Sequence, residues 1–423
     1  MAFIQASAGL VPEFQSPPTS SVIDDTITEE AGVRPPDGAP LHVTSLVQEG
    51  DLVARGAAVA CLRDAPDICF VTPLAGRVAR ISLLPGRALS EIVIFREADN
   101  ETTIHDTGKA GKAAGLRRLM QGAGLWPLLR RRPFGGMPDR TETPGAIVVM
   151  AADTQPFAPD PRLALEGCED AFNRGLGALA KLTDGPVFVV CDQTDWVPID
   201  AKTGDGRIQK VVCGHRHPQG APGIRIHDLC PAGLDTPVWD IHAEDTAALG
   251  ALLETGVLPM KRLVRIAGNA LRETRTVRTH PGADLRQLTQ RIVAPGPHVL
   301  MSGSPLDGQA ARWLGTRHRQ ITVLPRKDST QKRHWLIEAL TGTARATPAI
   351  PTAALTHAFG GTIPAISFIR ALSAGDDETA MKLGVLSLLE EDVALADYVL
   401  SDAGRITSEL RGMLNRIRTE FAA

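Results

Sequence analysis

One stretch of the sequence has the residue types and the spacing of a metal site. Cys213, His215 and His217 alternate along a predicted strand, and His227 and Cys230 follow after a loop. Side chains two residues apart on a strand point to the same face, and thiolate and imidazole are common ligands of zinc. The intervening loop, however, shows no geometry that would close such a site. We therefore favour the alternative, two cysteines buried in strands beside loop histidines, and expect no bound metal.

A second stretch, from Gly175 to Ala180, fits the phosphate-binding pattern GxGxxA. That pattern binds a dinucleotide when it follows a strand and opens a helix. Here it lies inside a predicted helix, residues 162–182, that precedes a strand. We therefore interpret it as small residues that allow close helix packing. The chain also lacks GxxxxGK[ST], HExxH and GxSxG motifs, and with them the signatures of several catalytic classes.

A basic and aromatic segment runs from Gly124 to Phe134 and contains Trp126 and three consecutive arginines that end at Arg132. The favoured interpretation is a helix end with solvated arginines, in which Trp126 and Phe134 are packing anchors. The alternative is an anchor for an anionic or aromatic partner.

Strands and helices alternate around these side chains. Strands are predicted at residues 146–151, 186–191, 208–213, 224–229 and 238–241, and helices at 162–182 and 244–255, the last ended by Gly256. This alternation is typical of an open α/β sheet, whose ligands bind at the carboxyl ends of the strands. We therefore expect Asp153, Asp192 and the loop from His215 to His217 at that crevice.

The regions on either side predict further modules. Residues 1–40 have the composition of a loop, and the glycine turns and short strands after them resemble a biotinyl/lipoyl-type barrel-sandwich. The first lysine of the chain is Lys109, beyond this module, so the module cannot carry a lysine-linked cofactor. Residues 261–324 predict a small β-grasp, and a helical block runs from Pro364 to Phe421. Acidic residues mark two of its helix starts, and one apolar stripe predicts core or subunit contact: Leu410, Met413, Leu414 and Ile417.

We thus expect an α+β multidomain protein. Its parts are a barrel-sandwich hybrid with an irregular N-terminal segment at residues 1–105, a Rossmann-like open α/β domain at 106–256, a β-grasp (SLBB-like) domain at 257–325, and a linker with a C-terminal helical domain at 326–423.

Length and composition limit the class of protein. A chain of 423 residues is too long for one core, which predicts several domains. The 45 Lys and Arg nearly balance the 48 Asp and Glu without a long basic run, which argues against nucleic acid as a partner. No apolar run approaches the roughly 20 residues of a spanning helix. Six scattered cysteines support neither a disulfide framework nor a four-cysteine iron–sulfur cluster. Since the N-terminus lacks a secretory pattern, we expect a reduced, cytosolic protein.

Taken in order, four stretches resemble the A subunit of the sodium-translocating NADH:quinone oxidoreductase. They are Gly124-Leu125-Trp126 and Arg132-Pro133-Phe134 with Asp153-Thr154; His217-Pro218 and Gly220 with Ile226-His227 and Val238-Trp239; Ser302-Gly303-Ser304; and Gly375-Asp376 with Glu390-Glu391-Asp392. The resemblance extends from about Val47 to Glu420. The chain departs from the family after the last stretch, because residues 398–405 lack the cysteine found there, and near His334-Trp335-Leu336.

The resemblance implies a peripheral subunit on the cytoplasmic face of the bacterial inner membrane. Such a subunit binds no cofactor, because FMN, FAD, riboflavin and iron–sulfur lie in other subunits. The implied partners are the B to F subunits, chiefly the B subunit, and ubiquinone. The matched positions that we expect to contact quinone or a partner are Trp126, Arg132, Phe134, His217 and His227, and no catalytic residue is expected.

The implied function is to help form or cover the quinone site of a translocase that couples quinone reduction to Na+ export, while the isolated chain is not catalytic. A purely structural docking subunit without a ligand is the alternative. A third possibility is a flavin retained in the α/β crevice, as in the related C subunit of Rnf-type complexes and the complex I flavoprotein, which would make the protein yellow.

Overall fold

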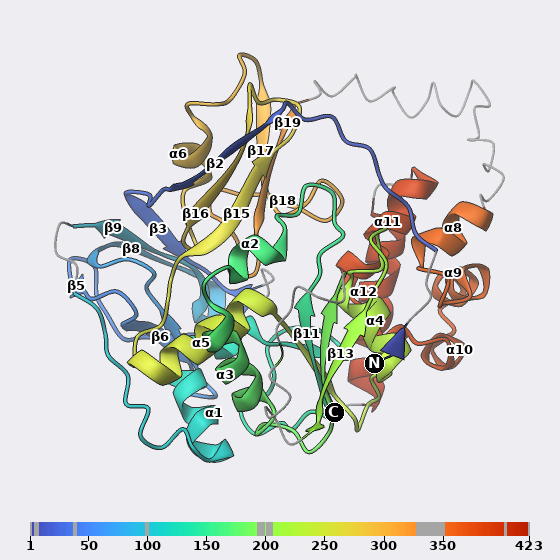
Figure 1. Ribbon diagram of the computed structural model, residues 1–423, viewed down its shortest axis with the longest axis horizontal. Coiled ribbons are helices and arrows are strands. Elements are labelled where there is room, and N and C mark those ends of the chain that lie inside the picture. Colours follow the sequence, from blue (N-terminus) through green and yellow to red (C-terminus); the bar gives the residue numbers. More distant parts are fainter. Residues whose placement is uncertain are drawn as a thin grey trace.

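Figure 1 shows the protein as a computed structural model, which describes residues 2–3, 8–36, 40–97, 101–192, 199, 206–326, 352–401 and 404–421. The chain forms a β-sandwich, an open sheet with helices on both faces, a second mixed sheet and a group of C-terminal helices. The α+β multidomain prediction is confirmed. The irregular segment predicted around His334 lies outside the described residues. Within the described parts, no helix is long and apolar enough to cross a membrane.

The N-terminal sandwich consists of two facing antiparallel sheets. One contains β3 (Glu30–Val33), β9 (Ala88–Arg96), β8 (Gly76–Leu84) and β5 (Leu52–Val53), and the other contains β4 (Val43–Ser45), β6 (Ala58–Leu62) and β7 (Cys69–Val71). Val59, Phe70 and Ile92 belong to the core between them. Gly76 is required where β8 pairs with β9, because a Cβ there would lie 2.0 Å from the carbonyl oxygen of Phe95.

The first 40 residues are not a loop throughout, contrary to the prediction. Besides β3, they contain β2 (Thr19–Asp25), which pairs in parallel with β16 (Thr274–Thr279) of the second sheet. Near the start of the chain, β1 (Ala2–Phe3) pairs with the open sheet. The polar sequence of β2 hides the strand, since β2 lies at a sheet edge and buries none of its side chains.

The open sheet has the strand order β1-β13-β12-β11-β14-β10. Its parallel strands are β11 (Ala146–Ala151), β12 (Val187–Cys191), β13 (Ile208–Val212) and β14 (Val238–His242), with β10 (Arg130–Arg132) as an antiparallel edge. Every residue of β11 and β12 is buried, because helices cover both faces. The strands predicted in these four places are confirmed.

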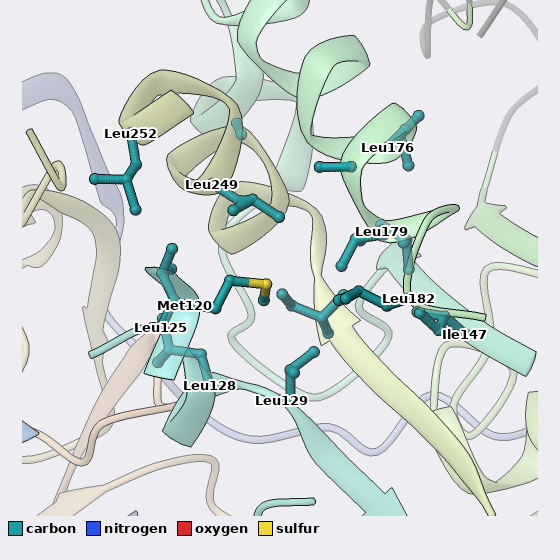
Figure 2. Close-up of a cluster of buried hydrophobic side chains, with 14 of the residues drawn as sticks. Met120, Leu125, Leu128, Leu129, Ile147, Leu176, Leu179, Leu182, Leu249 and Leu252 are labelled. Carbon is teal, nitrogen blue, oxygen red and sulfur yellow. The ribbon is translucent and has the colours of Figure 1, made fainter. Parts of the chain in front are cut away.

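Successive residues of β11 serve two different cores. Ile147 and Val149 face the larger core, together with α1 (Ala113–Gly122), η3 (Trp126–Leu128), α3 (Glu169–Leu179) and α5 (Ala243–Thr255). Figure 2 shows Met120 pointing into the space between Leu249 of α5 and Leu179 of α3, with Leu125 and Leu128 on its other side. Val148 points to the opposite face, which α4 (Pro222–Leu229) covers.

The strand predicted at residues 224–229 is wrong, because this segment forms helix α4. Ile224 and Ile226 alternate like strand residues, but on a helix two residues apart are about 200° apart around the axis. The two side chains therefore face different cores, Ile224 the C-terminal helices and Ile226 the sheet. Apolar residues on both sides of one helix imitate the period of a strand.

The helix predicted at residues 162–182 is instead two helices, α2 (Pro161–Leu165) and α3. Gly167 separates them with a φ of 76°. By contrast, the helix predicted at 244–255 is confirmed as α5, which ends at Gly256 with a φ of 72°.

The second sheet has the order β18-β17-β19-β15-β16-β2. Its strands not yet described are β15 (Arg262–Ala267), β17 (His298–Ser302), β18 (Gln309–Ala310) and β19 (Gln320–Pro325). The short helix α6 (Leu285–Thr289) lies between β16 and β17 in the chain. Val264, Ile266 and Val323 belong to its core. Residues 261–324 are thus rich in β-strands and contain one short helix, as is expected for the small β-rich module predicted there.

The C-terminal helices are α8 (Thr352–Ala358), α9 (Ala365–Ala374), α10 (Asp377–Lys382), α11 (Glu390–Leu400) and α12 (Arg405–Phe421), with η5 (Val385–Ser387) between α10 and α11. The carboxylate of Asp376 caps α10 by accepting a hydrogen bond from the Thr379 N–H. The predicted apolar stripe of α12 is buried in the core of this group. This group packs against α4, and ion pairs of Arg130 and Arg132 join it to β10.

Candidate functional site

The strand order of the open sheet reverses at β11, since β12 lies on one side of it and β14 on the other. Ligands of open α/β sheets bind outside the carboxyl ends of the strands at such a point. Here ion pairs occupy the carboxyl end of β14. Glu244 and Asp245 begin α5, and the guanidinium of Arg319 lies 2.9 Å from the first and 2.7 Å from the second. Burial acts to raise the pKa of Asp245, but Arg319 and Arg262 hold it below its usual range.

A groove of about 600 Å³ lies at the carboxyl ends of β11 and β13. Its walls are the N-terminal segment from Leu10 to Gln15, the loop from Thr154 to Phe157, and the side chains of His215 and His217. The predicted placement of the histidine loop at the crevice is confirmed. Asp153 and Asp192, which follow β11 and β12 and were also expected there, do not line the groove.

His217 is the most enclosed polar residue of the groove, with 2% of its surface exposed. Its backbone exchanges two hydrogen bonds with Leu10, of 2.7 and 3.0 Å. Its imidazole Nδ1 lies 3.2 Å from the hydroxyl of Thr154. Burial lowers the pKa of His217 to about 4, so the ring is neutral near neutral pH. His215 is exposed at the rim.

Three aromatic rings, which no sequence pattern predicted, form one edge of the groove. The ring of Phe14 lies 5.4 Å from that of Tyr398 and 6.1 Å from that of Phe157. Phe14 and Phe157 line the groove, and Tyr398 is 48% exposed beside Phe14. The three rings come from the N-terminal segment, the loop after β11 and helix α11. No local pattern connects such distant segments, so no signal in the sequence could have found them.

The loop after β11, which lines the groove, is hydrogen-bonded to the second-sheet region through Gln155. Asp153 accepts the N–H of Gln155 at 2.9 Å, and the Gln155 amide donates to Asp307 at 2.9 Å. Gln320 donates to the Gln155 side-chain oxygen at 2.8 Å. Burial raises the pKa of Asp153 to about 6, and the nearby charge of Asp307 also acts to raise it. The loop after β11 is therefore held from two domains.

The basic and aromatic segment lies inside the molecule. Trp126 is fully buried, packs edge-on against Trp239 with ring centroids 5.4 Å apart, and donates its indole N–H to the Pro138 carbonyl. Phe134 packs in the core of the C-terminal helices. The prediction of packing anchors is confirmed, and neither side chain lines the groove.

The expectation of solvated arginines is wrong for Arg132, which is fully buried. Its guanidinium contacts Asp240 and donates to Glu391 at 3.0 Å and to Asp392 at 3.1 Å. Arg130 also pairs with Glu391. These carboxylates come from β14 and α11, so the arginines join the open sheet to the C-terminal helices, which a local sequence pattern does not reveal.

The cysteines and histidines of the possible metal site do not converge. Strand β13 ends at Val212, so the alternation assumed for Cys213, His215 and His217 is absent. Among the described residues, no three His, Cys, Asp or Glu side chains are grouped closely enough to hold a metal ion. Burial raises the pKa of Cys213 to about 12, which disfavours the thiolate that binds zinc.

His227 and Cys230 lie on and just after α4. Burial also raises the pKa of Cys230 to about 12. His227 packs against Gly384 of the C-terminal region, where a Cβ would lie 2.2 Å from its Nδ1. His227 therefore contributes to the contact between α4 and that region and does not line the groove.

A second cavity, of about 80 Å³, lies where the sandwich, the α/β domain and the second sheet meet. Phe70, Leu128 and Met260 are among its apolar walls, and Glu244 and Arg262 are polar residues at its edge. None of the residues predicted to contact quinone or a partner lines it.

Comparisons with known proteins agree with this architecture. Residues 4–97 match the family described as the NqrA N-terminal barrel-sandwich hybrid domain, and residues 112–258 match the NqrA second alpha/beta domain. Solved structures of an NAD+-reducing [NiFe]-hydrogenase, in the H2-reduced state for example, reach a TM-score of only 0.41 at 11% identity over 73% of this chain and 64% of that chain.

Much of the chain also aligns with curated proteins named as the A subunit of the Na(+)-translocating NADH-quinone reductase. The protein of Pseudomonas aeruginosa (strain UCBPP-PA14) is 32% identical over 89% of this chain and 91% of its own length. That of Saccharophagus degradans is 30% identical over 99% of this chain and 100% of its own length. The chain therefore belongs to the NqrA family, the A subunits of the Na+-translocating NADH-quinone reductase.

Proposed function

We propose that this chain is a peripheral subunit that helps form or cover the quinone site of a membrane NADH:quinone oxidoreductase, a translocase that couples quinone reduction to Na+ export. It lies on the cytoplasmic face of the bacterial inner membrane. Its partners are the B to F subunits, chiefly the B subunit, and ubiquinone. FMN, FAD, riboflavin and iron–sulfur belong to the other subunits, and this chain carries no cofactor. The relatives' names support the complex and the ion.

One observation gives the main support for a chain that carries no cofactor and borders a quinone site. The carboxyl end of β14, where a nucleotide would bind in an open sheet, holds the ion pairs of Arg319 with Glu244 and Asp245, and the cavity beside these two carboxylates has a volume of only about 80 Å³. The neighbouring groove remains open, with aromatic walls and one neutral imidazole. A quinone head group needs apolar contacts together with a few placed polar groups, and the groove offers the rings of Phe14 and Phe157 together with the imidazole of His217.

The finer fold assignments belong to the same proposal. The strand order β13-β12-β11-β14, with helices on both faces, supports a Rossmann-like domain. The compact mixed sheet with the helix α6 supports a β-grasp (SLBB-like) domain.

Photo-labelling of the assembled complex tests the proposal. A ubiquinone that carries a photoreactive group on its ring is expected to label this chain, and excess unmodified ubiquinone is expected to suppress the labelling. The labelled peptides should include residues 10–15 or 154–157, which wall the groove. Absence of suppressible labelling anywhere on the chain would contradict the proposal and favour a purely structural docking subunit.

A matched pair of variants refines this test. Phe14→Ala removes a groove ring and should reduce labelling, whereas Phe421→Ala removes an exposed ring at the end of α12 and should not. The isolated chain should neither oxidise NADH with quinone nor be purified with a flavin. A yellow preparation with stoichiometric flavin would contradict the cofactor-free assignment.

A further inference from the structure

The polar side of the groove is built around a single histidine ring with one nitrogen already bound. Nδ1 of His217 lies 3.2 Å from the Thr154 hydroxyl oxygen. That same oxygen accepts the backbone N–H of Gly220 at 2.9 Å. The three residues therefore form a short hydrogen-bond chain from the backbone of one loop to the ring that lines the groove.

The direction of the hydrogen bond between Thr154 and His217 determines which ring nitrogen of His217 carries the proton. The Thr154 oxygen already accepts one hydrogen bond, and no acceptor other than His217 is found for its hydroxyl hydrogen among the described residues. If that hydrogen is donated to Nδ1, both the Gly220 N–H and the Thr154 hydroxyl hydrogen are paired. Nδ1 is then the acceptor, and Nε2 carries the remaining proton of the neutral ring.

Nε2 is the atom that a ligand would meet. It makes no hydrogen bond to any residue that the structure describes. It is also not completely enclosed, because the enclosed side-chain atoms without a hydrogen-bond partner do not include it. Since His217 lines the groove and its Nδ1 is turned to Thr154, Nε2 opens onto the groove.

We infer that Thr154 holds His217 in its Nε2–H form and that this N–H donates a hydrogen bond to a carbonyl oxygen of the quinone ring in the groove. The inference rests on the proposed function for the identity of the ligand. His217 is the binding residue, and Thr154 is a positioning residue that acts through it. A ring that presents only acceptors, as a quinone does, matches a site whose fixed group is a donor.

Glycine at position 220 is part of this arrangement. A Cβ on Gly220 would lie 2.8 Å from the Thr154 backbone nitrogen and 3.0 Å from its hydroxyl oxygen. Any larger residue would therefore push the hydroxyl away from the imidazole. The family motif His217-Pro218-x-Gly220 thus has a physical reason in the contact with Thr154.

The test uses the full chain with labelled histidine in long-range proton–nitrogen correlation spectra, which distinguish the two neutral tautomers from the imidazolium. His217 is expected as the neutral Nε2–H tautomer between about pH 5 and about pH 8. Thr154→Ser keeps the hydroxyl and should preserve that tautomer, whereas Thr154→Val should yield a mixture. An Nδ1–H tautomer, or an imidazolium at about pH 6, would overturn the inference.

The ligand is tested with a ubiquinone that has a single isoprene unit. Titration with this quinone should shift the Nε2–H resonance of His217. The dimethyl ether of the corresponding hydroquinone, which lacks carbonyl oxygens, should not shift it. Thr154→Val should weaken this binding about tenfold, the value of one neutral hydrogen bond, and Thr154→Ser should restore it.

The outcomes separate the two proposals. If the assembled complex is labelled by quinone but His217 does not respond to the titration, the assignment of His217 is wrong while the role of the chain stands. If the complex shows no suppressible labelling, the proposed function itself fails, whatever the tautomer of His217.

Discussion

At the scale of single residues, burial explains most of the unusual chemistry. Arg132 and Asp392 are both fully buried, and each is tolerated because the other neutralises it. His217 and His280 are buried without an ion-paired carboxylate, and both are kept neutral. The buried arginine and aspartate thus keep their charges because they pair with each other, whereas the two buried imidazoles, which have no such partner, stay neutral.

We expect Asp392→Asn to destabilise the protein by about 3 to 5 kcal/mol. The substitution removes the fully buried carboxylate from beside the guanidinium of Arg132, which then keeps only Asp240 and Glu391 as counter-charges. It also weakens the acceptors for the N–H groups of Gly223 and Leu389, both at 2.8 Å. Urea-induced unfolding measures the change.

The matched control is Asp377→Asn, whose partner Arg416 lies 2.7 Å away with half of its side chain exposed. That substitution should cost less than about 1 kcal/mol. Equal losses in the two variants would show that the buried ion pairs do not carry the stability assigned to them.

His280 makes stability depend on pH with a defined sign. Its Nε2 lies 2.9 Å from the Thr28 hydroxyl, and burial lowers its pKa from 6.5 to about 4. Between these values the unfolded chain binds a proton that the folded chain does not. The free energy of unfolding should therefore fall as pH is lowered through this range, by up to about 3 kcal/mol from this group.

His280→Gln should remove this contribution and flatten the decline in stability toward acid pH, whereas His215→Gln at the exposed rim should not. Unfolding by urea at several pH values provides the comparison. An unchanged slope in His280→Gln would rule out a buried neutral imidazole at this position.

At the scale of elements, two glycines decide how α3 and α5 pack. A Cβ on Gly175 would lie 1.9 Å from the carbonyl oxygen of Thr246, and one on Gly250 would lie 1.7 Å from that of Ala171. The apparent dinucleotide pattern at Gly175 therefore serves helix packing, as its place inside a predicted helix indicated.

Gly175→Ala should destabilise the protein by about 1 to 3 kcal/mol or more, because the two backbones must separate. Gly122→Ala is the matched control, since a Cβ there meets no atom within 4 Å and alanine favours a helix. Thermal unfolding should show a lower midpoint for the first variant and an unchanged or higher one for the second. If Gly175→Ala is neutral, the close approach of α3 and α5 is not required.

At the scale of the whole molecule, charged and backbone contacts tie the modules together. Arg319 links the second sheet to α5, and Arg132 links β10 to α11. Arg317 donates to the carbonyl oxygens of Pro127 and Leu129 in the α/β domain. The groove lies between such linked parts, so its shape depends on all of them remaining docked.

We therefore expect the open sheet and the C-terminal helices to unfold together. Tryptophan fluorescence, to which Trp126 and Trp239 contribute among the five tryptophans of the chain, and circular dichroism of the helices should follow the same urea transition. Asp392→Asn should shift both curves equally. Loss of helical signal before the fluorescence changes would show that the C-terminal group is an independent unit.

Several features could be predicted from the sequence because their signals are local. Apolar runs and caps indicated β11, β12 and α5, and glycine turns indicated the sandwich. The histidine loop was predicted at the crevice because it follows a strand. Local signals were misleading for α4, because its apolar residues face two cores on opposite sides of the helix and so alternate like those of a strand. They were absent for β2, because this edge strand is polar.

The tertiary structure alone decided what surrounds these elements. The same holds for three contacts between segments far apart in the chain: Arg132 with its carboxylates, the ring of Phe14 with that of Tyr398, and His217 with the Thr154 hydroxyl. Periodicity reports which way a side chain points relative to its own backbone. Which other segment it meets there depends on the packing of whole domains, and that packing determines burial, charge and the position of a proton.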